Sequence, residues 1–484
     1  MQISWLKFIY MMLMLGALFP QIAFTAKHRV MTLREAILLS IRYNPDIQSA
    51  DLQRIVDKYN LRRAQFEFEI QYALKGNATY TNSVINGIRS ESDTQNLTHT
   101  ASLLGPYGTT IQTNISNPVT HTAGSSRFYN PSAGVIVTQP LLRGFGPRVT
   151  LIPLYNAEDQ ELINRLSLKG TAISQITNVI NQYIFTVQAL NTLKAQQASL
   201  KQVEKDLQQA KLMVQAGKKG SADLIQFEAN LSTQKLSLQQ QEIALFQAKA
   251  QLLLLIGIEP TTEINVTETV PEIIKKLPSL EESICTALSN NVSYQQALIN
   301  IRTLKRNVTL ARDNIRPQLN LFASQTRGGG FGGLPDGGPE SLINGRNYSW
   351  QVGLTLDIPI STLPQEQAIA SAKVGLQQAQ INLAALKRET IINVKIAYKT
   401  LVSQKLQVAQ ASQAIKLAQQ NYDISKIKLQ YGKTTAFEVS TLQTSLTTAV
   451  INYVNTFASY VTSQANFDSI LGTTTDRWNL HVCY

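Results

Sequence analysis

The chain has 484 residues, of which 44% are hydrophobic and only 16% charged, against roughly 25% charged residues in an average soluble domain. Lys and Arg exceed Asp and Glu by 44 − 32 = 12, but the excess is spread along the chain and is not gathered into basic runs. This composition argues against a disordered chain and against a nucleic-acid-binding protein.

No pattern of catalytic or metal-binding residues stands out. Cys285 and Cys483 are too few for a disulfide framework, and the four histidines lie far apart without metal-ligand spacing. The tripeptide at 432–434 imitates the end of a phosphate-binding loop, but Ile427 stands where such a loop needs its first glycine. We therefore expect neither an enzyme nor a bound cofactor or metal.

The N-terminus predicts export. Lys7 precedes an apolar run from Phe8 to Phe19, and small residues up to Ala26 follow. This order is typical of a secretory signal peptide, so residues 1–26 are expected to be removed. No later stretch approaches the ~18–20 apolar residues of a membrane-spanning helix.

A helix is predicted at 33–66, where Thr32 and Glu35 have the spacing of a capping box. The same opening recurs 247 residues later, at Ser279 and Glu282, and at this offset Asn291 falls on Asn44. Matching helix starts so far apart indicate that part of the chain is duplicated.

Strand-like segments precede each of the two long helices. In the first half, 108–117 and 132–140 are the best candidates and 70–82 is a further one, while 83–131, rich in Asn, Ser, Thr and Gly, is expected to include a hydrated loop. In the second half, strands are expected at 318–326 and 348–360, on either side of a Gly-rich loop at 328–338.

The long helices are predicted at 157–214 and 365–429. In the second, core positions from Val394 to Leu429 recur every seven residues, and small residues such as Ala411 and Ala418 follow at the fourth place of the heptad. A sustained seven-residue repeat predicts helices that supercoil closely against neighbours.

A second match fixes the extent of the duplication. Gly217–Gly257 recurs as Gly432–Gly472, and at this offset of 215 Asp223 falls on Glu438. The chain is therefore interpreted as two copies of one unit. We place the first structural repeat at 27–273, the second at 274–472 and a C-terminal tail at 473–484, the first copy having 247 − 215 = 32 extra residues.

Two strands from each copy give four, which are too few to close a barrel, since about eight are needed. An open sheet would leave two edges and an apolar face exposed. The pattern therefore predicts that strands from several chains assemble into one barrel.

At its paired turns, Val214–Leu224 and Leu429–Val439, and at its strand endings, Gln139–Gly146 and Asp357–Ile360, the chain resembles the TolC-like outer-membrane efflux protein family. The resemblance implies a mostly α protein with a membrane β-barrel part. In that family a homotrimer forms, in which each duplicated protomer gives four strands to a shared 12-stranded β-barrel and long helices to a periplasmic α-barrel.

The same resemblance implies a function and a location. The protein would lie in the lipid of the cell outer membrane, with a periplasmic extension, as the exit duct of a tripartite efflux or type I secretion system. It would passively conduct substrates handed on by a periplasmic adaptor (membrane fusion) protein and, indirectly, by an inner-membrane transporter.

The two glycine turns would then be the periplasmic tips of helical hairpins. The residues implied to contact the adaptor are Gly217, Lys218, Asp223, Gly432, Lys433 and Glu438. Glu438 matches the first acid of a periplasmic gate, whereas Thr441 stands where the family has the second. From the residues alone, the two acids need only stabilise helix N-termini.

Several alternatives stay open. A periplasmic coiled-coil adaptor or structural protein of the cell envelope would show similar heptads and glycine-tipped hairpins. The 32 extra residues suit either a longer extracellular loop or additional structure at the barrel end. Drug efflux and protein secretion both fit, while six methionines and dispersed histidines give no support to metal efflux.

Overall fold

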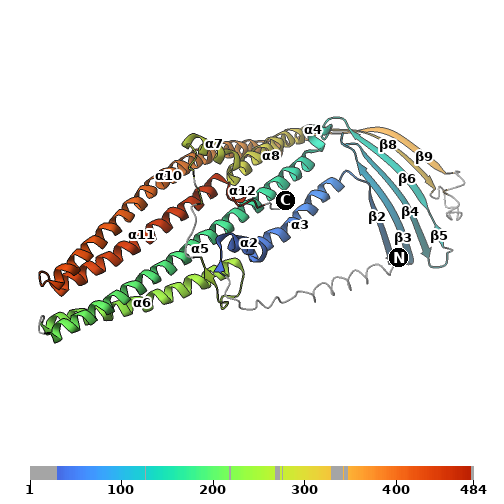
Figure 1. The fold of residues 1–484 in the computed structure, drawn as a ribbon. Coiled ribbons are helices and arrows are strands. Elements are labelled where there is room, and N and C mark those ends of the chain that lie inside the picture. The colour runs from blue at the N-terminus through green and yellow to red at the C-terminus, as the bar shows by residue number, and fades with distance from the viewer. Residues whose placement is uncertain are drawn as a thin grey trace. The chain divides into compact units, whose positions relative to one another are not determined.

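The computed structural model describes residues 30–125, 127–216, 220–267, 273–274, 276–328, 342 and 347–480. The predicted signal peptide and all but the first residue of the Gly-rich loop at 328–338 lie outside these residues. The chain folds into two compact units, the hairpin unit (1–43, 178–273 and 404–462) and the sheet unit (44–177, 274–403 and 463–484). Figure 1 shows the order of the elements along the chain.

The hairpin unit is built from two antiparallel helical hairpins, which are parts of the two copies. Its helices are α2 (Leu33–Tyr43), α6 (Ser221–Ile256) and parts of α5 (Ile152–Gln215), α10 (Leu363–Gln430) and α11 (Ala436–Leu471). Strand β1 (Val30–Met31) pairs in parallel with β7 (Asn265–Val266). One core cluster joins both hairpins and contains Leu207, Ala210, Phe227 and Ala436.

The sheet unit holds a seven-stranded antiparallel sheet and the helices next to it. The strands are β2 (Gln71–Ile85), β3 (Ile88–Leu104), β4 (Thr110–Thr122), β5 (Phe128–Tyr129), β6 (Ser132–Pro140), β8 (Gln318–Gly328) and β9 (Tyr348–Asp357). Their order is β2-β3-β4-β6-β8-β9, with β5 beside β4 (Figure 1). The helices particular to this unit are α3 (Pro45–Phe66), α4 (Pro147–Thr150), α7 (Leu280–Asn290), α8 (Val292–Asn314) and α12 (Thr474–Arg477).

The predicted helix at 33–66 is wrong at one point, because it is broken into α2 and α3 at Asn44. Asn44 is extended, with φ −64° and ψ 125°, and its side chain accepts hydrogen bonds from the N–H groups of Asp46 and Ile47. Pro45 causes the break, since a proline disfavours helical geometry in the residue before it and suits the first position of a new helix. Asn291 caps α8 in the same way, at the duplicated position.

The predicted loop within 83–131 is also wrong, because most of it forms β3 and β4. The sheet therefore has six long strands, two more than the four expected. Residues rich in Ser, Thr and Asn read as loop by composition, yet they suit a strand whose one face is polar. The expected strands at 70–82, 108–117, 132–140, 318–326 and 348–360 all overlap observed ones, and the last ends earlier, at Asp357 before Pro359.

The long helices and their heptads are confirmed. The helices α5 and α10 extend the predicted bounds by only a few residues. Along α10, the core positions Val394, Leu401 and Tyr422 are buried, whereas most residues between the heptad positions are exposed. A mostly α chain with one large antiparallel sheet and one small two-stranded sheet is thus the observed fold class. Among the described residues, no helix combines the length and apolarity of a membrane-spanning segment.

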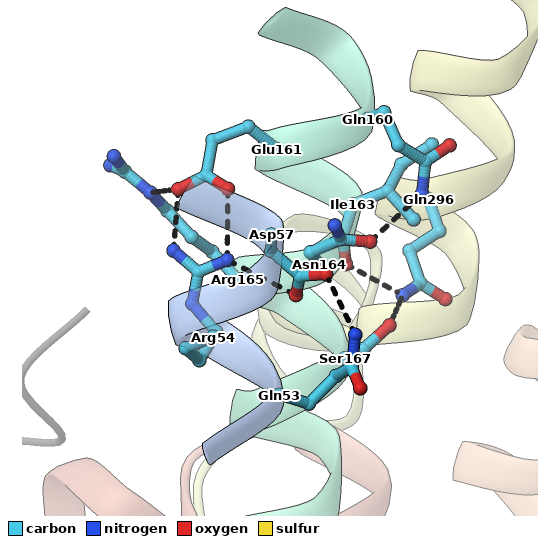
Figure 2. A network of polar contacts seen from close by, with 10 residues as sticks. All are labelled: Gln53, Arg54, Asp57, Gln160, Glu161, Ile163, Asn164, Arg165, Ser167 and Gln296. Carbon is cyan, nitrogen blue, oxygen red and sulfur yellow. Dashed lines mark hydrogen bonds and ion pairs between the residues drawn. The ribbon is translucent and has the colours of Figure 1, made fainter. Parts of the chain in front are cut away.

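Ion pairs to buried carboxylates tie α5 to its neighbours in the sheet unit. Arg54 of α3 forms a two-pronged ion pair with Glu161 of α5, one bond of which is 2.8 Å from Nη1 to Oε2 (Figure 2). Both side chains are only 5% exposed. The hydrogen bonds from Arg54 hold the pKa of Glu161 below its usual range, and the nearby Arg165 adds to this. On its other side, α5 receives a 2.8 Å bond to Asp159 from Arg302 of α8.

Candidate functional site

The sheet has two chemically different faces. Residues paired directly across an antiparallel ladder point to the same side, so the registers trace each face through all six long strands. Leu74 of β2 shares its side with His99 of β3, while its neighbour Lys75 shares the opposite side with Thr98. The same alternation continues through every further pair of strands.

The polar face consists mainly of uncharged polar residues, with a few apolar ones such as Ile136 and Phe322 among them. Among its paired residues from Gln71 to Thr81 and from Ser92 to Thr355, Lys75 carries the one charge, and Asp357 adds a second at the end of β9. Its members in the register between β3 and β4 are Ser92, Thr94, Asn96, Thr98, Thr100, Ser102, Leu104, Thr110, Gln112, Asn114, Ser116, Pro118, Thr120 and Thr122.

The opposite, apolar face is richest in hydrophobic residues on the two outermost strands. On β2 it carries Tyr72, Leu74, Gly76, Ala78 and Tyr80, and on β9 it carries Tyr348, Trp350, Val352, Leu354 and Leu356. These side chains are not buried: Tyr72 is 69% exposed and Trp350 71%. A large apolar surface left exposed on a folded chain marks contact with lipid or protein.

The dimensions of the apolar face match a membrane. From Tyr72 to Tyr80 the band covers nine residues of β2, and from Tyr348 to Leu356 it covers nine of β9. A membrane-crossing strand needs about 9–11 residues. Tyrosines end the band on β2, and Tyr348 and Trp350 lie at one end on β9, as aromatic girdles do at membrane interfaces. The strands β2 and β9 are the two ends of the sheet order, so each has one edge without a partner strand in the described chain.

The tip of the second hairpin is described in atomic detail. Gly432 has φ +67°, a left-handed conformation that glycine adopts without strain. Its N–H donates to the carbonyl of Leu429 at 3.1 Å, and the N–H of Lys433 donates to that of Lys428 at 2.9 Å. These bonds end α10 in a Schellman-type turn. The aromatic side chains beside the turn point outward, Tyr431 being 75% and Phe437 64% exposed.

Glu438 has a local role that its sequence position predicts. The N–H of Glu438 donates to Oγ1 of Thr435 at 3.2 Å, which caps the start of α11. The Glu438 carboxylate itself accepts a hydrogen bond from the Thr434 hydroxyl. Thr441, one turn further, is exposed, and its hydroxyl donates to the carbonyl of Phe437 at 2.8 Å. In this single chain, both residues are therefore engaged within their own hairpin.

The first hairpin tip lies partly outside the described residues. Gly217 and Lys218 are not among them, and Asp223 lies in the first turn of α6. The structure thus brings Gly432, Lys433 and Glu438 together at one tip and leaves the roles of the first tip as predictions.

A polar cluster that the sequence analysis missed holds the two hairpins together. The Tyr422 hydroxyl of α10 donates to Oδ2 of Asp206 on α5 at 2.7 Å, and Nζ of Lys426 lies 3.3 Å from Oδ1 of Asp206. Gln202 donates to the same Oδ1 at 2.8 Å. Burial, together with the hydrogen bond to Asp206, raises the pKa of Tyr422 far above its usual value, so the hydroxyl keeps its proton.

The positions of this cluster were visible in the sequence, but their pairing was not. Tyr422 occupies a heptad core position of α10 at which the other heptads have aliphatic residues, and this exception could have drawn attention to it. Its partner Asp206 is 216 residues away, and nothing local links the two. Among the described residues, no group of three or more His, Cys, Asp or Glu side chains is arranged to hold a metal ion.

Comparisons with known proteins agree with this geometry. The model of the family described as Outer membrane efflux protein matches residues 284–473. No curated protein sequence matches the chain.

Solved structures share the fold. The CusC channel matches with 15% sequence identity and a TM-score of 0.70, covering 91% of this chain and 92% of its own. The outer membrane channel MtrE of Neisseria gonorrhoeae matches with 15% identity and a TM-score of 0.68, covering 91% and 89%. The outer membrane protein VceC of Vibrio cholerae has 14% identity and a TM-score of 0.67, covering 91% and 96%. Residues 284–473 therefore carry the sequence pattern of the Outer membrane efflux protein family, and the chain has the fold of TolC-like outer-membrane channels, which confirms the resemblance found in the sequence.

Proposed function

We propose that this protein is the outer-membrane exit duct of a tripartite efflux or type I secretion system. The observation that carries the proposal is the sheet with one exposed apolar face and one uncharged polar face, joined to long heptad helices. The apolar face suits lipid, and the polar face suits a water-filled lumen. Substrates would pass through without covalent chemistry, so the protein would not act as an enzyme.

We propose that the duct is a homotrimer. The six-stranded wall of one chain leaves β2 and β9 as edges, and unpaired edges in a membrane are costly. Several copies placed side by side would pair these edges and close the wall. The family resemblance gives three as the number of copies.

The hairpin tips are proposed to receive the periplasmic adaptor, which would link the duct to an inner-membrane transporter. At the second tip, exposed Tyr431 and Phe437 lie next to Gly432, Lys433 and Glu438. Exposed aromatic residues are common in protein interfaces. Gly217, Lys218 and Asp223 are proposed for the equivalent contact at the first tip.

The entrance is proposed to be gated where the hairpins end. Glu438 and Thr441 would narrow the passage, and the bond between Tyr422 and Asp206 would hold one hairpin against the other. Opening by separation of the hairpins would have to break that bond.

The second candidate function is a periplasmic coiled-coil adaptor or structural protein. It accounts for the heptads but gives no reason for an apolar sheet face that extends over nine residues along β2 and along β9. Membrane fractionation separates the two functions. We expect the mature protein in the outer membrane as a trimer that resists mild detergent, and recovery of the whole protein as a soluble periplasmic species would contradict the exit-duct function.

Cysteine crosslinking tests the adaptor contact. Cysteines placed at Lys218 and at Lys433 should capture the adaptor in intact cell envelopes, whereas a cysteine at exposed Lys387, within α10, is the control and should capture less. Equal capture at all three positions, or none at the tips, would count against the proposed tip role.

A further inference from the structure

The two copies of the repeat contribute unequally to the sheet. Between α3 and α4 the first copy has four long strands, whereas between α8 and α10 the second has two. Strand β2 follows α3 as β8 follows α8, and β6 precedes the long helix of its copy as β9 does. The strands β3 and β4 are therefore the addition in the first copy, and they account for most of its 32 extra residues.

The added strands are part of the sheet itself. Strand β3 pairs with β2 along the whole of β2, from Gln71↔Ser102 to Ile85↔Ile88. Strand β4 pairs with β3 on one side and with β6 on the other, from Thr110↔Thr138 to Ser116↔Ser132. The strand β2 is connected to β6 only through them.

The two faces also continue across the added strands. Their polar-face residues from Ser90 to Ser102 and from Thr110 to Thr122 are Ser, Thr, Asn, Gln or Pro, and Ile88 and Leu104 stand at the two ends of β3. Their other face carries Leu97, Leu103, Ile111, Ile115 and Val119 among polar residues, and Leu97 and Ile115 are 55% and 50% exposed. The charged residues of this face, Arg89, Glu91 and Asp93, lie at the end of β3 next to its turn with β2. A hairpin that projected into water from the end of a barrel would have no need for a one-sided pattern in line with its neighbours.

We propose that β3 and β4 belong to the membrane wall, so that three copies close a barrel of 18 strands and not 12. This inference rests on the proposed function as a trimeric duct. Successive strands in the order β2-β3-β4-β6-β8-β9 are antiparallel. Because the number of these strands is even, the first one, β2, and the last one, β9, run in opposite directions. The β2 strand of one copy therefore meets the β9 strand of the next copy in antiparallel orientation, as a closed barrel requires.

The addition changes the width of the duct within the membrane. With strands about 4.8 Å apart and tilted by about 40°, a 12-stranded barrel is about 24 Å across and an 18-stranded one about 36 Å, measured between backbones. The wider lumen would be lined by the polar face, with its uncharged Ser, Thr and Asn side chains. The proposed duct therefore suits bulkier substrates and gives little charge selection within the barrel.

Spin labels test whether the added strands lie in the wall. The experiment uses the full chain in liposomes, with Cys285 and Cys483 replaced by serine and single cysteines introduced at Leu97, Ile115, Asn96 or Ser116. We expect oxygen, which concentrates in lipid, to enhance the spin relaxation of labels at Leu97 and Ile115. A water-soluble nickel reagent should instead enhance the relaxation of labels at Asn96 and Ser116. Preferential nickel access at all four sites would overturn the proposal.

The barrel diameter gives a second, independent readout. Electron cryomicroscopy of the trimer should show a ring of about 36 Å. A trimer in the outer membrane with a ring of about 24 Å would overturn the 18-strand barrel and leave the exit-duct function standing. A protein that is monomeric or absent from the outer membrane would instead refute the proposed function.

Discussion

The bond between Tyr422 and Asp206 offers a direct test of how the two hairpins are held together. The substitution Tyr422→Phe removes one hydroxyl and leaves the ring in its buried heptad position. The hydroxyl donates to Oδ2 of Asp206 at 2.7 Å. Because burial and the hydrogen bond to Asp206 raise the pKa of Tyr422, this donor persists at every physiological pH.

The magnitude follows from the surroundings of Asp206. A hydrogen bond to a charged group contributes about 1.5–3 kcal/mol. Asp206 keeps Lys426 at 3.3 Å and Gln202 at 2.8 Å in the variant, so its charge is not left without partners. If opening separates the hairpins, the ratio of open to closed channels should rise about 10- to 150-fold for each chain of the proposed trimer whose bond must break, since 1.36 kcal/mol corresponds to a factor of ten.

Single-channel recording in planar bilayers measures that ratio directly. The control is Tyr431→Phe, the same chemical change at an exposed tyrosine beside the tip. We expect Tyr422→Phe to spend far more time open than the wild type, and Tyr431→Phe to match the wild type. Equal open times for Tyr422→Phe and the wild type would refute the idea that this bond keeps the entrance closed.

Three further substitutions test the packing of the chain by thermal unfolding. Arg54→Met should cost at most about 3–5 kcal/mol, because buried Glu161 loses its two-pronged partner and keeps only Arg165, at 3.1 Å. Arg62→Met, at an exposed pair, should cost at most about 1 kcal/mol. Because Arg54 lowers the pKa of Glu161, the pair stabilises the fold above the ordinary glutamate pKa of 4.5, and the difference between wild type and variant should shrink as pH falls below it; a difference that grows in acid would contradict this. Asn44→Ala should cost about 1 kcal/mol through loss of the α3 cap, and no change in melting would contradict the capping role. Gly472→Ala should destabilise strongly, because φ is +71° and a Cβ would lie 2.5 Å from a backbone carbonyl oxygen; wild-type stability would show that the turn can relax.

Features decided within one or two helical turns could be predicted from the sequence. The capping box at Thr32 and Glu35 is present, with the N–H of Glu35 donating to Oγ1 of Thr32 at 3.3 Å and the N–H of Thr32 donating to Glu35 at 3.0 Å. The glycine turn at Gly432 and the heptads of α10 likewise formed as expected. In each case the signal and the structure depend on the same few neighbouring residues.

Features decided by distant partners were missed. Along β3, the apolar face holds Gln95 and His99 beside Leu97, so polar residues follow one another and the alternation of a strand is hidden. These residues form a strand because β2 and β4 pair with them on both sides. The link from Asp206 to Tyr422 depends in the same way on two helices from different copies.

The place of the added strands explains how one copy could diverge without disturbing the other parts of the chain. Each strand reverses the direction of the chain, so one extra strand would leave the following long helix at the wrong end of the sheet. Two extra strands restore the direction, and β6 still leads through α4 into α5 at the same end of the sheet as β9 leads into α10. The heptad helices set their own packing by residues within them, so they tolerate this change as long as their starting points are kept. A wall that grows by hairpins can therefore widen a duct in the membrane while the sequence of the helical hairpins, including the tip at Gly432, stays unchanged.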